Sequence, residues 1–254
     1  MNETICDKKN GAAALVVLDC GLMPYGEALA LQLELCQRRQ VDAIENTVLL
    51  VEHPAVITLG ARKTENRLLT GRASLEGQGI EVVVVGRGGG TTAHNQGQIV
   101  VYPIVKLKSL GLSINEYVRQ LEAVGIGLLA EYGIAAGRRK GYPGLWVGEK
   151  KIGSIGVQVK RWVTLHGMAI NMCNDLGIFE HVVPCGLKGV CMTSVATLSK
   201  AEISMADVKA RLGRLCAGAF ASEEWVRDEC SKHNHGQDVC ATDHGQDAHA
   251  TEEV

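Results

Sequence analysis

The sequence predicts an α/β protein built on a mixed β-sheet with flanking helices. The first observation is a series of short apolar runs interrupted by glycine or proline, which is typical of buried strands. The second is that only a few stretches space their apolar residues as a helix does. The third is the composition: 254 residues, 46% hydrophobic and 21% charged, suffice for one sizeable core or two modest ones and exclude disorder throughout.

The first half of the chain contains one predicted helix and five predicted strands. The helix is expected over residues 24–39, where alanines and leucines alternate with polar residues. Pro54 and Gly60 end two of the apolar runs, because neither residue continues a central strand well. The strands are expected at residues 12–19, 46–53, 56–59, 80–85 and 98–103.

The second half contains two predicted helices, at residues 111–132 and 206–220, whose apolar positions recur near helical spacing. Strands are expected at residues 144–147, 151–159 and 164–171. No linker precedes residue 227, so we expect a single catalytic domain over residues 1–227.

Residues 228–254 differ from the rest of the chain. They carry a net charge of −6 and four of the eight histidines, which leaves the preceding body at about +4. A nine-residue unit, HGQDVCATD from His235, is followed by HGQDAHATE from His244, without a hydrophobic face. We expect an acidic, disordered tail, and a metal-scavenging segment is the alternative.

The cysteine pattern indicates a reduced compartment. The nine cysteines form no C-x-x-C pair and their number is odd, which fits neither a zinc ribbon nor a disulfide framework. The apolar run at residues 12–18 is too short for a membrane span or a convincing signal peptide. The sequence therefore predicts a cytoplasmic protein with no membrane association.

A glycine-rich loop joins two strands between residues 81 and 99. A phosphate-binding P-loop needs Lys-Ser or Lys-Thr after its last glycine, whereas Thr91 and Thr92 follow Gly90. A dinucleotide fingerprint needs three spaced glycines that open a helix, and this segment returns to strand. Two interpretations stay open: the loop lets a ligand approach backbone N–H groups between Arg87 and His94, or it is a tight hairpin.

Two further segments place reactive side chains beside glycines, namely residues 149–156 and residues 183–187. Cysteine attacks as the thiolate, and an unperturbed pKa near 8.5 leaves only about 3% ionised at neutral pH. A catalytic Cys185 therefore needs a nearby positive charge, which Lys150 or Lys151 could supply, and strand alternation alone does not say which lysine faces inward. Most other cysteines are expected to be small packing residues, including Cys20, Cys36, Cys173 and Cys216.

Four motifs follow one another in the chain: R-G-G-x-x-T-x-H-x-x-G-Q at 87–98, K-I-x-S-I-G at 151–156, H-G-x-A-x-N at 166–171 and P-C-G, then T-S, at 184–194. Over roughly residues 45–200 the chain resembles the lipoyl(octanoyl) transferases, and residues 52–60 are similar to that family's upstream strand pair. One departure is visible. The family's usual His-Gly-Pro-Gly-Gln is here His94-Asn95-Gln96-Gly97-Gln98, so the resemblance does not define the shape of this turn.

The resemblance implies the fold of the biotin and lipoate ligases and, without a cofactor or metal, transfer of an octanoyl or lipoyl group from acyl carrier protein to a lysine. The implied acceptors are lipoyl domains of a 2-oxoacid dehydrogenase E2 subunit or the glycine cleavage H protein. Cys185 becomes acylated and Lys151 acts as acid and base. The implied acyl-binding residues are Arg87, Gly88, Gly89, Gly90, Thr91, Thr92, Ala93, His94, Ser154, Ile155, Gly156, Gly167, Met168 and Ala169.

Two alternatives remain beside this interpretation. An ATP-dependent lipoate or biotin ligase of the same fold would use its lysine on phosphate but has no use for Pro-Cys-Gly, and a non-catalytic binder of acyl carrier protein or lipoyl domain would not need both Lys151 and Cys185. The four histidines of the body lack metal-ligand spacing. Dispersed basic residues and an aromatic content of 4% give no indication of nucleic-acid binding.

Overall fold

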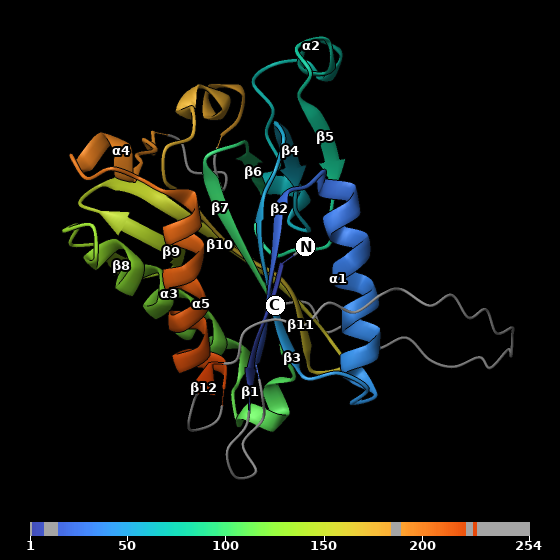
Figure 1. Ribbon diagram of the computed structural model, residues 1–254. Coiled ribbons are helices and arrows are strands. Elements are labelled where there is room, and N and C mark those ends of the chain that lie inside the picture. Colours follow the sequence, from blue (N-terminus) through green and yellow to red (C-terminus); the bar gives the residue numbers. More distant parts are fainter. Residues whose placement is uncertain (1, 8–14, 184–188, 222–225, 228–254) are drawn as a thin grey trace, which may run out of the picture.

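The computed structural model describes residues 2–7, 15–183, 189–221 and 226–227. In this part of the chain a nine-stranded sheet carries helices on both faces, and a three-stranded sheet lies at one end of it (Figure 1). The helices are α1 (Tyr25–Gln40), α2 (Arg72–Gly77), α3 (Ile114–Ala130), α4 (Val195–Leu198) and α5 (Met205–Phe220). Short 3₁₀ turns lie at η1 (Lys63–Glu65), η2 (Leu107–Leu110) and η3 (Leu176–His181).

The large sheet has the strand order β12-β1-β2-β3-β7-β11-β10-β9-β8. Its strands are β1 (Asn2–Asp7), β2 (Leu15–Leu22), β3 (Asn46–Glu52), β7 (Gln98–Ile104), β8 (Gly137–Arg139), β9 (Tyr142–Val147), β10 (Lys150–Lys160), β11 (Val163–Asn171) and β12 (Val226–Arg227). The small sheet has the order β5-β4-β6, with β4 (Val56–Leu59), β5 (Glu81–Val84) and β6 (Thr91–His94). In the two described sheets only the β2–β3 and β4–β5 pairs are parallel, which confirms the predicted mixed sheet.

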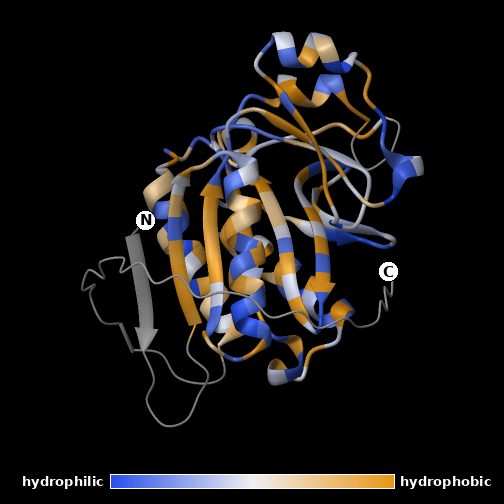
Figure 2. Cartoon of the chain, turned by 90° about the vertical axis from the view of Figure 1, so that its right-hand side faces the viewer, coloured by the Kyte–Doolittle hydropathy of each residue, from blue (hydrophilic) through white to orange (hydrophobic). Residues whose placement is uncertain are grey.

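Side chains of the central strands alternate between two helix-covered faces, as the pleat of a strand requires. One face packs against α3 and α5 and the other against α1, on opposite sides of the sheet in Figure 1. Because both faces are covered, the strands are hydrophobic almost throughout (Figure 2). On β7 the alternation is plain, since Ile99 and Val101 point to α3 and α5 whereas Val100 and Tyr102 point to the face of α1.

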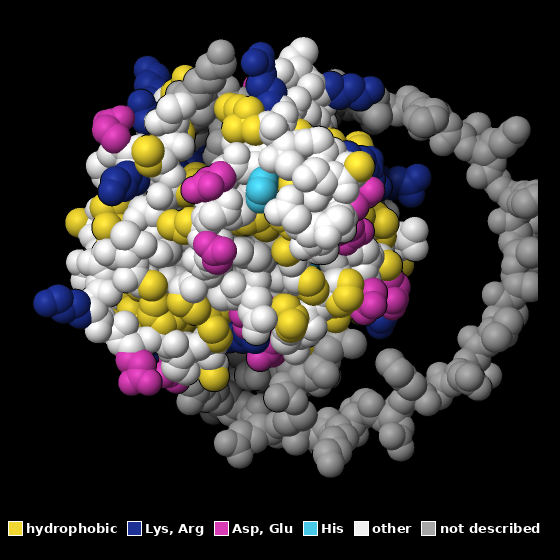
Figure 3. Space-filling model, turned by 90° about the horizontal axis from the view of Figure 1, so that it is seen from above, with side chains coloured by type: hydrophobic (Ala, Val, Ile, Leu, Met, Phe, Trp, Pro, Cys, Tyr) yellow, Lys and Arg dark blue, Asp and Glu magenta, His cyan; other side chains and the backbone are white. Residues whose placement is uncertain are grey.

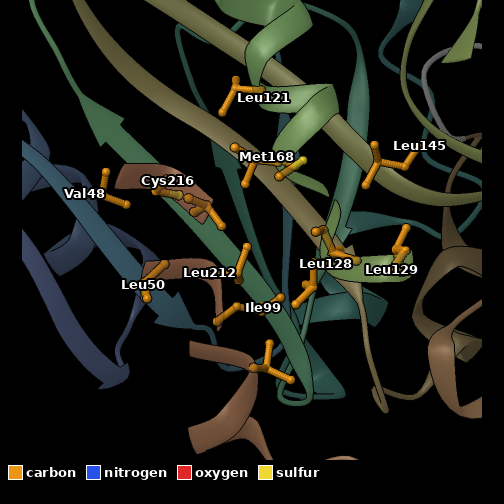
Figure 4. Packing of buried hydrophobic residues seen from close by; sticks show 14 of the residues in the cluster. Val48, Leu50, Ile99, Leu121, Leu128, Leu129, Leu145, Met168, Leu212 and Cys216 are labelled. Atoms are coloured by element: carbon orange, nitrogen blue, oxygen red, sulfur yellow. The ribbon is translucent and has the colours of Figure 1, made fainter. Parts of the chain in front are cut away.

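The face of α3 and α5 holds the largest hydrophobic core. Leu121 and Leu128 of α3 and Leu212 of α5 lie over Met168 of β11 and Leu145 of β9 (Figure 4). A serine N-cap begins each of these two helices. The Ser113 hydroxyl accepts from the Glu116 N–H and the Glu116 carboxylate accepts from the Ser113 N–H, which is a capping box for α3, and Ser204 caps α5.

The predicted elements agree with the structure apart from short or isolated ones. The helices predicted at 24–39, 111–132 and 206–220 correspond to α1, α3 and α5, and the eight predicted strands each overlap an observed one. β6 was not predicted, because four residues after three glycines carry too little pattern, and β1, β8, β12, α2 and α4 were also missed. The predicted tail at 228–254 lies outside the described residues, and no described helix is long and apolar enough to cross a bilayer.

The helix packing over Leu145 gives a matched test with two glycines. A Cβ added at Gly125 of α3 would lie 2.4 Å from Leu145 Cδ1 and 2.9 Å from Met168 Sδ, whereas one added at Gly218 of α5 meets no atom within 4 Å. Gly125→Ala should therefore destabilise the fold by about 1–3 kcal/mol despite the better helix propensity of alanine. Gly218→Ala should stabilise it by about 0.5 kcal/mol. Urea unfolding of both variants tests this, and equal effects would contradict the packing described.

Candidate active site

A cavity lies on the α1 face of the large sheet, where the glycine-rich loop of the small sheet covers β10 and β11. Ser154, Ile155 and Gly156 of β10 line it on one side and residues 166–169 of β11 beside them. The other lining residues are Tyr25, Arg87, Gly88, Gly89, Thr92, His94, Val100 and Tyr102. Segments from both sheets and from α1 therefore build one site.

Small residues leave room for this cavity. Ser154 lies opposite Ala169 and Gly156 opposite Gly167 across the β10–β11 pair, so small residues stand in two successive rows on the α1 face. The glycines also allow close approach of other chain segments. A Cβ at Gly156 would lie 2.8 Å from the Gly88 carbonyl oxygen, and one at Gly167 would lie 2.2 Å from that of Val101.

The glycine-rich loop is held over the sheet by two consecutive residues, Arg87 and Gly88. The Gly88 N–H donates to the Val157 carbonyl of β10 at 2.9 Å. Arg87 is buried, and its guanidinium donates to the Thr58 carbonyl at 2.8 Å and to the Thr58 hydroxyl at 2.7 Å. Arg87 thus fixes the loop to β4 while its side chain borders the cavity.

A group of buried histidines and tyrosines lies at the cavity's α1 end. The Tyr102 hydroxyl is 2.8 Å from His53 Nε2, and His53 Nδ1 is 2.7 Å from the Met23 carbonyl oxygen. A carbonyl only accepts, so Nδ1 carries the hydrogen of His53 and the Tyr102 hydroxyl donates to Nε2. Tyr25 lies over the ring of His94 with ring centroids 6.0 Å apart, and its hydroxyl is 3.4 Å from His166 Nδ1.

Burial keeps this group neutral. Loss of hydration lowers the pKa of His53 to about 4 and the pKa values of His94 and His166 to about 3. Burial also raises the pKa of Tyr25 to about 12. These side chains therefore act near neutral pH as uncharged hydrogen-bonding groups. His166 also has a φ of +59°, a left-handed conformation that costs a β-strand residue of order 1 kcal/mol and that occurs often at functional sites.

A β-bulge in β10 decides which way Lys151 points. Trp146 pairs with Lys151 and Leu145 with Gly153, so Ile152 is the extra residue. Ile152 and Leu145 belong to the core under α3, which leaves Lys151 on the opposite face, the face of the cavity. Lys151 is 1% exposed, and its Nζ lies 5.4 Å from the centre of the Trp146 ring, a cation–π contact.

The chain that follows Pro-Cys-Gly returns to this lysine. The Lys151 N–H donates to the Cys191 carbonyl at 3.0 Å, and the Thr193 N–H donates to the Lys151 carbonyl at 2.9 Å. On the other side of the motif, the Val183 N–H donates to the Arg67 carbonyl at 3.1 Å. Cys185 itself lies outside the described residues, so its pairing with Lys151 stays a prediction.

Eleven of the fourteen predicted acyl-binding residues border the cavity. The remaining three, Gly90, Thr91 and Ala93, lie behind the lining. The Thr91 hydroxyl accepts from the Arg67 N–H at 2.9 Å, and Ala93 packs in the small sheet's own core. These contacts hold the loop rather than face the cavity.

Several site residues were not predicted from the sequence as binding residues. Tyr25, Tyr102 and His53 meet only through the tertiary fold, and no spacing signals their contact. Gln98 and Asn171 lie within the quoted motifs, yet the motifs gave them no role. Both are buried beside the cavity, and the Gln98 Nε2 donates to Asn171 Oδ1 at 2.8 Å.

The departure at Asn95 has a structural explanation. The Asn95 amide donates to the Asp175 carbonyl at 2.8 Å, and the Asn174 amide donates to Asn95 Oδ1 at 2.9 Å. Two side-chain hydrogen bonds thus fasten the β6–β7 turn to the segment before η3. Asn95 therefore stabilises the position of this turn and does not line the cavity.

Within the described ranges no three His, Cys, Asp or Glu side chains gather as a metal-ligand set. The cavity offers instead apolar surface, uncharged histidine and tyrosine side chains and backbone N–H groups, beside the Arg87 guanidinium that is bound to Thr58 and with a buried lysine on the same sheet face. That combination suits an uncharged acyl chain with a reactive carbonyl group.

The fold is that of lipoate protein ligases. The LipL1 protein of P. falciparum in complex with lipoate matches with a TM-score of 0.64 at 14% identity, covering 81% of this chain and 62% of that one. A bi-partite lipoate protein ligase from Thermoplasma acidophilum matches with a TM-score of 0.58 at 16% identity, covering 81% and 82% of the two chains. These similarities confirm the predicted fold class.

Residues 24–216 match the model of the lipoyl protein ligase A/B catalytic domain, and the chain belongs to this family. Its relatives include an octanoyltransferase of Syntrophobacter fumaroxidans, 45% identical over 192 residues, which covers 76% of this chain and 84% of the relative. An octanoyltransferase of Syntrophotalea carbinolica is 42% identical over 196 residues, covering 77% and 90%. The resemblance noted from the motifs and the predicted enzyme class, an acyltransferase, are thereby confirmed.

The neutral histidines predict a pH dependence of stability. In the unfolded chain each would titrate near its ordinary pKa of 6.5, whereas the folded values are about 4 for His53 and about 3 for His94 and His166. Below pH 6.5 the unfolded chain binds more protons, so stability falls as pH falls toward 4, by up to about 1.4 kcal/mol per pH unit for each histidine.

Urea unfolding at about pH 7, 6 and 5 measures this slope before most carboxylates titrate. His53→Gln removes one of the three groups and should make the slope shallower. A free energy of unfolding that stays constant between these pH values would contradict the neutral, buried state of the cluster.

Proposed function

We propose that this protein transfers an octanoyl group from acyl carrier protein to a lysine of a lipoyl domain through an acyl-Cys185 thioester, with Lys151 as acid and base. The observation that carries the proposal is the shared position of two features. A buried lysine and an apolar cavity under a glycine-rich loop lie on one face of the same strands. The names of the relatives, which are octanoyltransferases, support the acyl group and the reaction.

In the first half-reaction the Cys185 thiolate attacks the thioester carbonyl of the acyl donor. A new C–S bond forms to Cys185, the C–S bond to the carrier breaks, and the carrier leaves as its thiol after taking a proton. One thioester replaces another, so little free energy is lost. The Lys151 ammonium would stabilise the thiolate before attack and then donate this proton.

In the second half-reaction the amine of the acceptor lysine attacks the acyl-Cys185 carbonyl. An amide bond forms, the C–S bond to Cys185 breaks, and the neutral Lys151 amine takes the proton that the attacking nitrogen loses. Backbone N–H groups of the cavity wall near Ser154–Gly156, on the edge of β10 that β9 leaves uncovered after Ser154, would stabilise the oxyanion in both steps. The side chains of Val100 and Ala169, which lie on the α1 face, and the backbone of the glycine-rich loop would hold the octanoyl chain.

The partners follow from this chemistry. We propose octanoyl-acyl carrier protein as donor, and lipoyl domains of a 2-oxoacid dehydrogenase E2 subunit or the glycine cleavage H protein as acceptors. The body's charge of about +4 favours encounter with acidic carrier proteins. Lys and Arg are spread around the outline of the face seen in Figure 3 rather than gathered in one patch. The attraction to an acidic carrier would therefore come from the overall charge and not from one basic docking patch on this face. A cytoplasmic site for the reaction agrees with the need for an unpaired Cys185.

Mass spectrometry of the intact protein after incubation with octanoyl-acyl carrier protein, without ATP, tests the proposal. We expect an octanoyl adduct that hydroxylamine removes and that Cys185→Ser abolishes. An absolute requirement for ATP would instead indicate a ligase, and a protein that never becomes acylated while it binds the carrier would indicate a non-catalytic binder.

Adjacent lysines provide a matched test of the acid–base role. Lys151 is 1% exposed on the cavity face, whereas Lys150 is exposed. Lys151→Ala should slow both half-reactions by about a hundredfold or more, since a positioned acid–base group contributes on this scale. Lys150→Ala should stay within about twofold of the parent protein. Equal losses from the two substitutions, measured in single-turnover experiments, would show that the wrong lysine was assigned.

A further inference from the structure

A relay of buried hydrogen bonds, which runs from His94 through Gln98 and Asn171 to Thr193, connects the cavity to the segment beside Lys151. His94 Nδ1 lies 2.7 Å from Gln98 Oε1, the Gln98 Nε2 donates to Asn171 Oδ1 at 2.8 Å, and the Asn171 Nδ2 donates to the Thr193 carbonyl at 3.0 Å. All four residues are at most 5% exposed. In such a buried chain each group must meet a partner of the opposite kind, because an unpaired polar group is costly.

Two backbone carbonyls fix the direction of this chain. The Thr193 carbonyl can only accept, so the NH₂ group of Asn171 faces it and the Asn171 oxygen faces Gln98. The Ala93 carbonyl, 3.3 Å from Gln98 Nε2, likewise requires the NH₂ group of Gln98 on that side. Both constraints leave Gln98 Oε1 toward His94, and this oxygen can only accept. The hydrogen of neutral His94 is therefore on Nδ1, and Nε2 carries a lone pair.

We propose that Gln98 and Asn171 are positioning residues that hold His94 as a hydrogen-bond acceptor in the cavity, where its Nε2 accepts from the amine of the incoming lysine. The proposal rests on the proposed function for the identity of that amine. Thioester exchange on Cys185 brings no amine to the acyl carbon, whereas the second half-reaction does. His94 should then orient the attacking nitrogen, so the relay matters for amide formation and not for acylation of the enzyme.

The far end of the relay gives it a second consequence. Thr193 bonds through its N–H to the Lys151 carbonyl and through its own carbonyl to Asn171. The same backbone unit therefore contacts the strand that carries the lysine and the amide that orients His94. The backbone of Thr193 thus fixes the position of Lys151, which would accept a proton, relative to His94, which would orient the amine.

Nitrogen-15 NMR of histidine-labelled protein reads the state of His94 directly, with His94→Asn used only to assign its signals. We expect a pyrrole-like Nδ1 and a pyridine-like Nε2 in the parent protein. In Gln98→Met the acceptor beside Nδ1 is absent, so Nε2 should lose its pyridine-like signal. A pyrrole-like Nε2 in the parent protein would overturn the proposal.

Rates of the two half-reactions separate a positioning role from structural damage. In Gln98→Met we expect transfer from isolated octanoyl-Cys185 enzyme to the lipoyl domain to slow about tenfold, equivalent to one well-placed hydrogen bond, with acylation within about twofold. Gln78→Met, the same substitution at the exposed residue that follows α2, should change neither rate. Equal slowing of both steps, or of neither, would overturn the proposal.

Failure of the proposed function gives a different result. A parent protein that never forms octanoyl-Cys185 would refute the transferase, while the NMR signals would still report whether Gln98 fixes the tautomer of His94.

Discussion

The arrangement of the site depends on one extra residue in β10. Lys151 and Ser154 are three positions apart, so a regular strand would place them on opposite faces of the sheet. The bulge at Ile152 turns Ile152 and Gly153 together toward α3 and brings Lys151 to the face of Ser154. In a regular strand the ammonium would enter an apolar core beside Leu145, where an uncompensated charge is very costly.

The cavity face of the sheet also buries polar side chains, and backbone carbonyls supply the hydrogen-bond partners that these side chains would otherwise lose with water. The Met23 carbonyl fixes the tautomer of His53, and the carbonyls of Ala93 and Thr193 fix the amides that lead to His94. A carbonyl can only accept a hydrogen bond, so the carbonyl at the start of each network decides which group donates and which accepts at every later step. Burial then keeps the histidines uncharged, and the cavity stays suited to an apolar chain although polar rings border it.

The sequence predicts most of the architecture because buried strands and amphipathic helices leave local patterns, as in residues 46–52 and 114–130. The cavity wall is predicted through the resemblance of the motifs at residues 87–98, 151–156 and 166–171 to those of the transferase family, whereas the glycines alone leave a hairpin as an equal interpretation. The sequence does not locate the bulge, since a glycine inside a strand marks either a bulge or a close backbone approach and Gly153 alone does not decide between them. Nor does it predict Tyr25 and His53, whose contacts exist only once α1 is docked on the sheet.

The position of the segment beside Lys151 follows from the same constraint. A bulge interrupts the regular hydrogen bonding of a strand. On the edge of β10 opposite β9, the last β10–β11 pair is Gly153 with Ile170, and beyond it the Cys191 carbonyl and the Thr193 N–H pair with Lys151. The chain after Pro-Cys-Gly therefore continues the sheet on this edge where β11 ends. The bulge therefore aims the lysine, and the segment that pairs with it carries the Asn171 contact that orients His94. Sequence motifs far apart in the chain act together because one irregular strand is the common element that each of them contacts.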